Sequence, residues 1–274
     1  MEIVIAGKNR LAVAGLGIAL EHFEAAQISV VLSNTSDAER RNFPVLEKAA
    51  VMSGVKIQEI GDVYSMADSV FLSLEYDKIV NPALFSTKNL YNLHLSLLPD
   101  FRGVATSAWP IIMGRDFAGA TLHEIDYGID TGSILSQVTF PISSDETSFS
   151  LHNKLLDSAH QLLLESFPGL ISKTLLPTPQ SGSGSYFGRS NLVFSDIDLA
   201  NFTTYDDLQR WFRALYFPIY QLPKFRDQKI SAVQLCGEGK RKPSGSWWWS
   251  ECGRYIYVSL QGGVARLTIA ATQI

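Results

Sequence analysis

The chain has 274 residues, of which 46% are hydrophobic and 18% are charged, and its formal net charge is -4. This size and composition can supply a full hydrophobic core, in one large domain with a smaller one beside it. No basic stripe runs along the sequence, which counts against a nucleic acid partner, and no apolar stretch approaches the roughly 20 residues that span a bilayer.

The N-terminus and the cysteines indicate a cytoplasmic protein. Residues 2–6 run directly into an apolar segment, without the basic start and the cleavage site of a signal peptide. Cys236 and Cys252 are too few for a disulfide framework or a zinc site, although adjacent strands could bring them together. Reduced thiols are the rule in the cytoplasm. We therefore expect no membrane partner and no bound metal.

Short apolar segments alternate with helical patterns through the first half of the chain. This alternation predicts an α/β fold with a Rossmann-like, mostly parallel sheet and helices on both faces. In such sheets ligands bind beyond the carboxyl ends of the strands. A polar turn is expected at 34–37. The expected strands are 2–6, 29–33, 55–58, 69–73 and 90–94, and the expected helices are 12–25 and 44–53.

The pattern continues after residue 94 and then changes. A loop at 97–103 leads to a helix that holds Trp109. A long helix should begin near Ser148, with Asp145 or Thr147 as its N-cap, and should stop at Pro168-Gly169. Further strands are expected at 120–125, 134–140, 229–235, 255–260 and 265–270, with a helix at 205–216. We predict a large domain at 1–176, a linker rich in Ser, Gly and Pro at 177–190, and a small C-terminal α+β subdomain at 191–274.

An asparagine and a histidine at the end of one strand mark the candidate site. Asn92 and His94 lie two residues apart, so their side chains project to the same face of the strand. Asp130 follows between two turn signals in the stretch DYGIDTG. An amide, an imidazole and a carboxylate that converge can bind an oxyanion, move a proton and orient its carrier. These are parts for acyl transfer without a nucleophile from the protein.

Other motifs carry weaker signals. Gly7, Gly15 and Gly17 have the wrong spacing for a dinucleotide fingerprint. Residues 7–10 place two cations and an amide at a helix N-terminus, which favours either a phosphate contact or an ordinary exposed turn. His22, His123, His152 and His160 are interpreted as packing or surface residues, Trp247–Trp249 as core or oligomer interface, and the basic run 239–242 as a solvated loop.

Two stretches carry a family resemblance. NLHLSLLPDFRG (92–103) and GATLHEIDYGIDTGSIL (119–135) resemble the signature of 10-formyltetrahydrofolate-dependent formyltransferases. The resemblance implies a catalytic triad of Asn92, His94 and Asp130 and a folate formyl donor, with no metal. It implies donor contacts at Leu74, Tyr76, Asp77, Lys78, Ile79, Leu98 and Asp126. Substrate contacts are expected at Lys8, Asn9, Arg10, Arg102, Gly103, Thr106 and Trp109.

Two further stretches favour the branch that formylates nucleotide-linked amino sugars. The similarity to amino-sugar enzymes lies in IAGKNRLAV (5–13) and in the region from YFGRS through LQRWFRALYFPIYQLPKF (186–225). Within that region the chain departs from the common sequence pattern of the family at 190–198. The implied acceptor is a dTDP-4-amino-4,6-dideoxyhexose used in surface polysaccharide synthesis, such as lipopolysaccharide O-antigen. A homodimer through the C-terminal region is expected. The alternatives are a 3-amino sugar, methionyl-tRNA, hydrolysis of formyltetrahydrofolate, and a non-catalytic sugar-nucleotide binding module.

Overall fold

The computed structural model describes residues 1–191, 198, 202–237, 242–261 and 263–271. The chain divides into two compact units. Their bounds differ from the predicted domains, because two short segments between 107 and 151 group with the C-terminal part, and the N-terminal part extends to Arg189. The first unit comprises Met1–Thr106, Phe117–Pro141 and His152–Arg189, and the second comprises Ser107–Asp116, Ile142–Leu151 and Ser190–Ile274.

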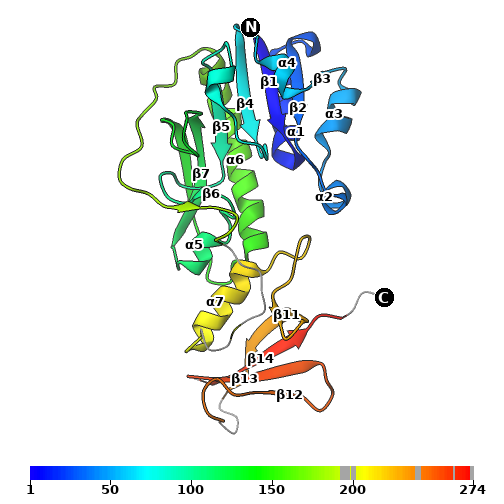
Figure 1. Ribbon diagram of the computed structural model, residues 1–274, viewed down its shortest axis with the longest axis vertical. Coiled ribbons are helices and arrows are strands. Elements are labelled where there is room, and N and C mark those ends of the chain that lie inside the picture. Colours follow the sequence, from blue (N-terminus) through cyan, green and yellow to red (C-terminus); the bar gives the residue numbers. More distant parts are fainter. Residues whose placement is uncertain (192–197, 199–201, 238–241, 262, 272–274) are drawn as a thin grey trace. The chain divides into compact units, whose positions relative to one another are not determined.

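A seven-stranded sheet forms the centre of the first unit (Figure 1). In sheet order, the first five strands pair in parallel and the last two pairings are antiparallel, which confirms the mostly parallel sheet. β1 and β4 are almost wholly buried, as expected for parallel strands covered on both faces. The strands, in sheet order, are β3 (Lys56–Gln58), β2 (Ile28–Leu32), β1 (Glu2–Gly7), β4 (Ser69–Leu74), β5 (Leu90–His94), β7 (Phe117–Glu124) and β8 (Ile134–Pro141).

Helices pack on both faces of this sheet. At Gly15 of α1 the backbone approaches Leu74 and Leu163, so α1 lies tightly between β4 and α6. On the other face Val63 of α4 packs with Val4 and with other buried residues of the sheet. The helices are α1 (Asn9–His22), α2 (Asp37–Asn42), α3 (Leu46–Met52), α4 (Ile60–Val63) and α6 (Ser148–Ile171), with short 3-10 turns η1 (Ala25–Gln27) and η2 (Pro82–Leu84).

Several helices differ from their predicted bounds, and α1 begins and ends three residues earlier than the expected 12–25. The polar turn expected at 34–37 instead opens α2, because Ser36 and Glu39 form a capping box. The long helix α6 begins after Thr147, whose hydroxyl accepts from the Ser150 N–H. It does not stop at Pro168 but continues to Ile171. Proline removes one helix hydrogen bond, yet the buried side chain of Leu170 anchors the last turn.

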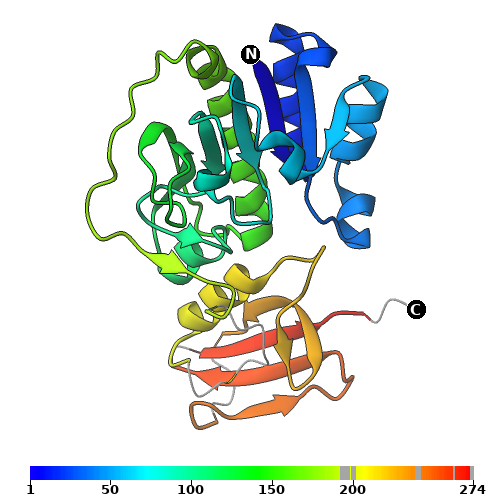
Figure 2. The same cartoon turned by 45° about the horizontal axis from the view of Figure 1, so that its top comes forward.

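The second unit is an antiparallel sheet with a helix packed against it (Figure 2). Leu208 and Phe212 of the helix α7 share a core with strand residues such as Ile256 and Leu267. Its strands, in sheet order, are β10 (Lys224–Phe225), β11 (Gln228–Leu235), β14 (Gly263–Ile269), β13 (Tyr255–Leu260) and β12 (Trp247–Trp249), and its helices are α5 (Trp109–Ile112) and α7 (Tyr205–Leu215).

The three consecutive tryptophans form the strand β12, which the sequence pattern did not predict. Trp247 packs against the core of the second unit. Trp248 stacks on Tyr257, with Lys242 over its ring, and Trp249 is 45% exposed. Trp247 and Trp248 are half-buried, and β12 lies at the edge of the five-stranded sheet. Except for Lys242, the basic run 239–242 lies outside the described residues.

The segment predicted as a linker, 177–190, contacts the first unit at several points. Thr178 exchanges two backbone hydrogen bonds of 2.8 Å with Ile134. The strand β9 (Tyr186–Phe187) pairs in parallel with β6 (Arg102–Gly103). We call residues 178–187 the strap, because the segment runs along the first unit between these two attachment points (Figure 1).

Candidate active site

Asn92 and His94 lie at the carboxyl end of β5, on the same face of the strand. β5 pairs with β4 on one side and with β7 on the other, where Asn92 is opposite His123 and His94 is opposite Thr121. His94 is buried and Asn92 is half-buried. The site therefore forms where the sheet changes from parallel to antiparallel pairing, beyond the end of a central strand.

Asp130 reaches this point from the loop between β7 and β8. The loop is tight, because the Asp126 carboxylate accepts from the Gly128 N–H at 3.0 Å and from the Thr131 hydroxyl at 2.6 Å. Gly132 is needed because a Cβ there would lie 1.9 Å from the Glu124 carbonyl oxygen. Asp130 itself has a left-handed backbone, with φ of 55°, which aspartate tolerates better than most residues.

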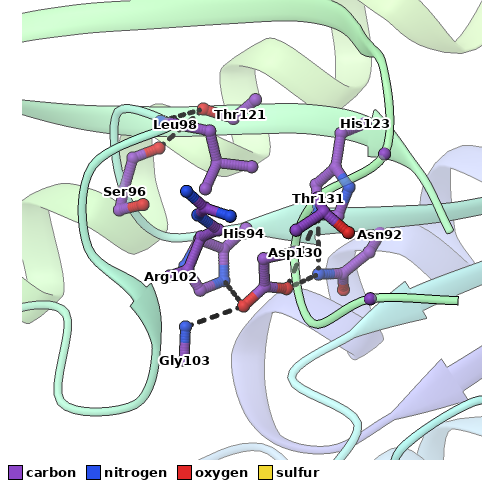
Figure 3. Close-up of polar contacts among 12 residues, drawn as sticks. Asn92, His94, Ser96, Leu98, Arg102, Gly103, Thr121, His123, Asp130 and Thr131 are labelled. Carbon is purple, nitrogen blue, oxygen red and sulfur yellow. Dashed lines mark hydrogen bonds and ion pairs between the residues drawn. The ribbon is translucent and has the colours of Figure 1, made fainter. Parts of the chain in front are cut away.

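The three predicted side chains meet around the Asp130 carboxylate (Figure 3). Asn92 Nδ2 donates to Oδ1 at 3.2 Å, and His94 Nδ1 lies 3.6 Å from Oδ2. The backbone N–H of Gly103 donates to the same Oδ2 at 2.8 Å. On its other side, His94 Nε2 donates to the Phe101 carbonyl at 3.0 Å. The structure thus brings Asn92, His94 and Asp130 together.

The charges of this cluster follow from burial and from these contacts. Burial alone raises the pKa of Asp130, but the His94 ring, the His123 ring and the Gly103 N–H together lower it to about 2. Burial lowers the pKa of His94, and the nearby Asp130 only partly opposes this effect. At neutral pH the cluster therefore contains an ionised Asp130 and a neutral His94, whose Nδ1 is available to take up a proton.

His123 is a fourth member of the cluster, although its sequence context suggested only a packing residue. Its Nε2 lies 3.1 Å from Asn92 Nδ2 and 3.7 Å from Asp130 Oδ1. The side chain is 2% exposed. The available signal was that His123 lies on the strand that leads into the Asp130 loop. The pairing of β5 with β7, which places it opposite Asn92, was not visible in the sequence.

The strap holds two loops at the site, the Asp130 loop and the loop 97–103, whose Phe101 and Gly103 contact the triad. Gln180 Nε2 donates to the backbone carbonyls of Asp130 at 2.8 Å and Gly132 at 2.9 Å. The Ser185 hydroxyl accepts from the Phe101 N–H at 2.8 Å. Arg102, predicted to contact substrate, donates through Nη2 to the Ser183 carbonyl at 2.6 Å and through Nε to Pro99. These contacts fix the loop 97–103 on the strap.

The stretch predicted to bind the formyl donor leaves β4 beside the triad, since Ser73 of β4 is opposite Asn92. Leu74 is buried, whereas Ile79 is 80% exposed and Lys78 is exposed. The Tyr76 hydroxyl and Asp77 Oδ1 are buried atoms without a hydrogen-bond partner among the described residues. Buried polar atoms normally have a partner, so these two atoms fit a ligand that carries donors and acceptors. The N–H of Leu98, another predicted donor contact, is bonded to the Thr121 hydroxyl.

The residues predicted to bind phosphate follow β1. Lys8 donates to Glu39 at 2.6 Å, and Arg10 forms an ion pair with Asp157. Asn9 between them is 5% exposed, and its Oδ1 has no partner within the described chain. Both cations are thus already balanced by carboxylates. Of the other predicted substrate contacts, Thr106 ends a segment of the first unit, and Trp109 begins α5 of the second.

Glu75, the first residue after β4, is a buried carboxyl group. Its Oε1 lies 3.9 Å from Nε2 of His152 on α6. Burial raises the pKa of Glu75 to about 7, against the opposing effect of Lys8. Burial also lowers the pKa of His152 to about 4. Between these values the two groups form a neutral pair.

Replacing Glu75 by glutamine is therefore expected to stabilise the protein at pH 8 but not at pH 5. The pKa of Glu75 is raised on folding, so the folded state binds the proton more tightly, and stability falls as pH rises from about 4.5 to about 7. Glutamine stays neutral throughout, which predicts a gain of roughly 2 to 3 kcal/mol at pH 8. Urea unfolding at both pH values measures this. Equal effects at pH 5 and pH 8 would contradict it.

Comparison with known proteins adds independent findings. The family model "Formyl transferase" matches residues 20–167. The structure of an N-formyltransferase from Helicobacter canadensis with folinic acid and dTDP-3-aminofucose is similar at a TM-score of 0.86 and 30% identity, over 98% of this chain and 99% of that one. WlaRD, a sugar 3N-formyl transferase solved with dTDP and 5-N-formyl-THF, has a TM-score of 0.86 and 29% identity, over 100% and 99%.

Curated relatives match over shorter stretches. A methionyl-tRNA formyltransferase from Clostridium tetani is 41% identical over 96 residues, which are 35% of this chain and 31% of that protein. One from Halorhodospira halophila is 29% identical over 195 residues, 66% of this chain and 63% of that protein. The matches span less than two thirds of the length of these relatives. Among the described residues, no group of three or more His, Cys, Asp or Glu could hold a metal ion, and no helix is long and apolar enough to cross a membrane.

Proposed function

The chain belongs to the formyl transferase family, and from this premise we propose that it transfers a formyl group from 10-formyltetrahydrofolate to the amine of a nucleotide-linked amino deoxysugar. The observation that carries the proposal is the neutral His94 beside the ionised Asp130. Such a pair can accept the proton that an attacking amine must lose. Two structural relatives near 30% identity match over almost their full length: a sugar 3N-formyl transferase and an N-formyltransferase solved with a dTDP-linked amino sugar.

The proposed reaction joins the amine nitrogen to the formyl carbon and breaks the bond between that carbon and the folate nitrogen. The folate donor supplies the activated formyl group. His94 Nδ1 takes the proton that the amine loses, and the resulting imidazolium donates to both Asp130 and the Phe101 carbonyl. Because the Asp130 carboxylate and the Phe101 carbonyl are both acceptors, only a ring with a hydrogen on each nitrogen donates to both. The proton then passes to the folate nitrogen as the leaving group.

The negative charge that develops on the formyl oxygen needs a hydrogen-bond donor. Asn92 is the side-chain amide at the site, and its Nδ2 already points at the Asp130 carboxylate. A donor aimed at the developing charge contributes about 3 kcal/mol to the transition state. The residues predicted to contact the folate lie at the end of β4 and directly after it, beside Asn92. They are Leu74, Tyr76, Asp77, Lys78 and Ile79. The Tyr76 hydroxyl and Asp77 Oδ1, which have no hydrogen-bond partner among the described residues, support a role in holding the folate.

The position of the acceptor amine is the finer part of the proposal. The sequence resemblance favoured a 4-amino sugar, but the two full-length relatives near 30% identity carry the words 3N-formyl transferase and dTDP-3-aminofucose. A 4-N formyltransferase from Francisella tularensis is 20% identical, which supports the common fold alone. We therefore propose a dTDP-linked 3-amino sugar as the preferred acceptor. A cytoplasmic location, a homodimer and a role in surface polysaccharide synthesis stay predictions.

A panel of acceptors tests this function. The protein is incubated with 10-formyltetrahydrofolate and each of several dTDP-, UDP- and GDP-linked 3-amino and 4-amino sugars, and product masses are read for an added formyl group. We expect the highest kcat/KM with a dTDP-3-amino sugar. Two further reactions are run: one contains methionyl-tRNA in place of the sugar, and the other contains no amine. Preferential formylation of the tRNA, the substrate class that the curated relatives' names suggest, would overturn the sugar proposal, as would turnover that needs no amine.

A further inference from the structure

His123 occupies a position that the proposed mechanism does not yet use. It lies on β7 directly opposite Asn92 of β5, and the two side chains are on the same face of the sheet. The ring is 2% exposed, so water does not supply its hydrogen bonds. Each ring nitrogen instead faces a group of the protein: Nδ1 lies 2.7 Å from the Glu124 carbonyl oxygen, and Nε2 lies 3.1 Å from Asn92 Nδ2.

These two neighbours determine the tautomer of the ring. A carbonyl oxygen only accepts hydrogen bonds, so Nδ1 must carry the hydrogen that is donated to Glu124. Nε2 has two neighbours, the Asn92 amide nitrogen at 3.1 Å and Asp130 Oδ1 at 3.7 Å. Only the first is within hydrogen-bond distance, and an amide nitrogen only donates, so Nε2 is the acceptor and carries no hydrogen. These two contacts thereby hold the hydrogen of His123 on Nδ1. The second-partner hydrogen bond of a histidine commonly fixes its tautomer in this way.

The amide of Asn92 is consequently fixed between two acceptors. One of its hydrogens is directed at His123 Nε2 and the other at Asp130 Oδ1, 3.2 Å away. The reversed amide would place its oxygen against the Asp130 carboxylate and against the unprotonated His123 nitrogen, and it would form neither hydrogen bond. Asp130 alone contacts the amide from one side. The contact with His123 removes the remaining rotational freedom (Figure 3).

We propose that His123 is a positioning residue that, through its Nδ1–H tautomer, holds the Asn92 amide so that the N–H group facing Asp130 Oδ1 also faces the reaction centre, where the developing oxyanion shares this hydrogen. The inference rests on the proposed formyl transfer, in which Asn92 donates to the developing oxyanion. His123 does not itself touch the reacting atoms. It prepares the donor before the substrate binds, so that the amide need not be oriented during the reaction.

A double-mutant cycle tests this role. His123→Leu removes the acceptor, and we expect kcat to fall about tenfold, the worth of one well-made hydrogen bond, with KM for both substrates little changed. His123→Gln retains an acceptor oxygen on a shorter side chain and should recover most of this loss. In an Asn92→Ala background, His123→Leu should have no further effect, because its influence acts through Asn92. A similar fall in both backgrounds would overturn the proposal, and so would an unchanged kcat.

A second measurement needs neither turnover nor a substrate. Nitrogen-15 NMR of the labelled wild-type protein identifies the protonated ring nitrogen of each histidine, with His123→Gln used to assign the His123 signals. We expect the hydrogen of the His123 ring to be on Nδ1 and not on Nε2. A hydrogen on Nε2, or a doubly protonated ring, would overturn the proposal even if the enzyme is active. If no amino sugar is formylated, the proposed function fails, and the NMR result still decides how the ring is held.

Discussion

Replacing His94 with alanine is expected to lower kcat by on the order of 10³, within the range contributed by a positioned acid or base. The dissociation constant of the folate should change little. His94 is buried between the Asp130 carboxylate and the Phe101 carbonyl, and it is the neutral base of the cluster. Without the imidazole, the proton of the attacking amine has no side chain to receive it. The residues predicted to bind the formyl donor, at the end of β4 and after it, are unchanged in this variant.

Single-turnover kinetics and folate binding measured side by side check this expectation. His94→Gln is the companion variant, because its amide can still donate to the Phe101 carbonyl but cannot accept a proton at neutral pH. It should be as slow as His94→Ala while perturbing the fold less. His160→Ala, at an exposed position on α6, serves as a control for the loss of a histidine elsewhere. Near-normal turnover of either His94 variant would refute the proposed mechanism.

Asp130→Asn is expected to reduce kcat by on the order of 10³ to 10⁴, as for other carboxylates that orient a catalytic histidine. The shape of the side chain is retained, but its charge is lost. The new amide must also place a donor either against the Gly103 N–H or against the Asn92 amide. Because Asp130, more than the Phe101 carbonyl, raises the pKa of His94 against the effect of burial, that pKa should fall further.

NMR titration of His94 and the pH dependence of kcat measure these effects, with Asp116→Asn at an exposed position as the matched control. Stability supplies a separate check. The pKa of Asp130 is lowered on folding to about 2, so its contribution of about 2 kcal/mol is present above the unfolded value near 4 and is lost as pH falls towards 2. The variant should therefore be destabilised at pH 7 and by only about a third as much at pH 2.5. An Asp130→Asn protein with the wild-type His94 pKa would show that the two side chains are not coupled.

The sequence was sufficient for the sheet and for the triad because both leave local signals. Buried strands read as short apolar runs, and a polar pair at a strand end needs only the period of two to be placed on one face. Asn92, His94 and Asp130 therefore emerged together, and the resemblance added the formyl donor. The helix α6 was predicted to begin near Ser148 with Asp145 or Thr147 as its N-cap, and the Thr147 hydroxyl accepts from the Ser150 N–H. Its continuation past Pro168 depends on burial, which no local pattern records.

Features that depend on pairing between distant segments were not predictable. The antiparallel register of β5 and β7 places His123 against Asn92, and nothing near His123 in the sequence specifies that register. Lys8 finds its carboxylate partner 31 residues away in Glu39. The strap has the composition of a flexible connection. Its Gln180 nevertheless bonds to the Asp130 loop 50 residues away, a contact that requires the folded sheet.

The groups that hold the triad are for the most part backbone atoms. Phe101 and Glu124 contribute carbonyls, Gly103 contributes an N–H, and the strap holds the Asp130 loop through main-chain oxygens. Side chains at positions 101 and 124 can therefore be exchanged without removing these supports, provided that the backbone path is kept. Such a scaffold separates the chemistry from the choice of acceptor. In a laboratory library, the surrounding side chains can therefore be varied while the backbone supports of Asn92, His94 and Asp130 stay in place.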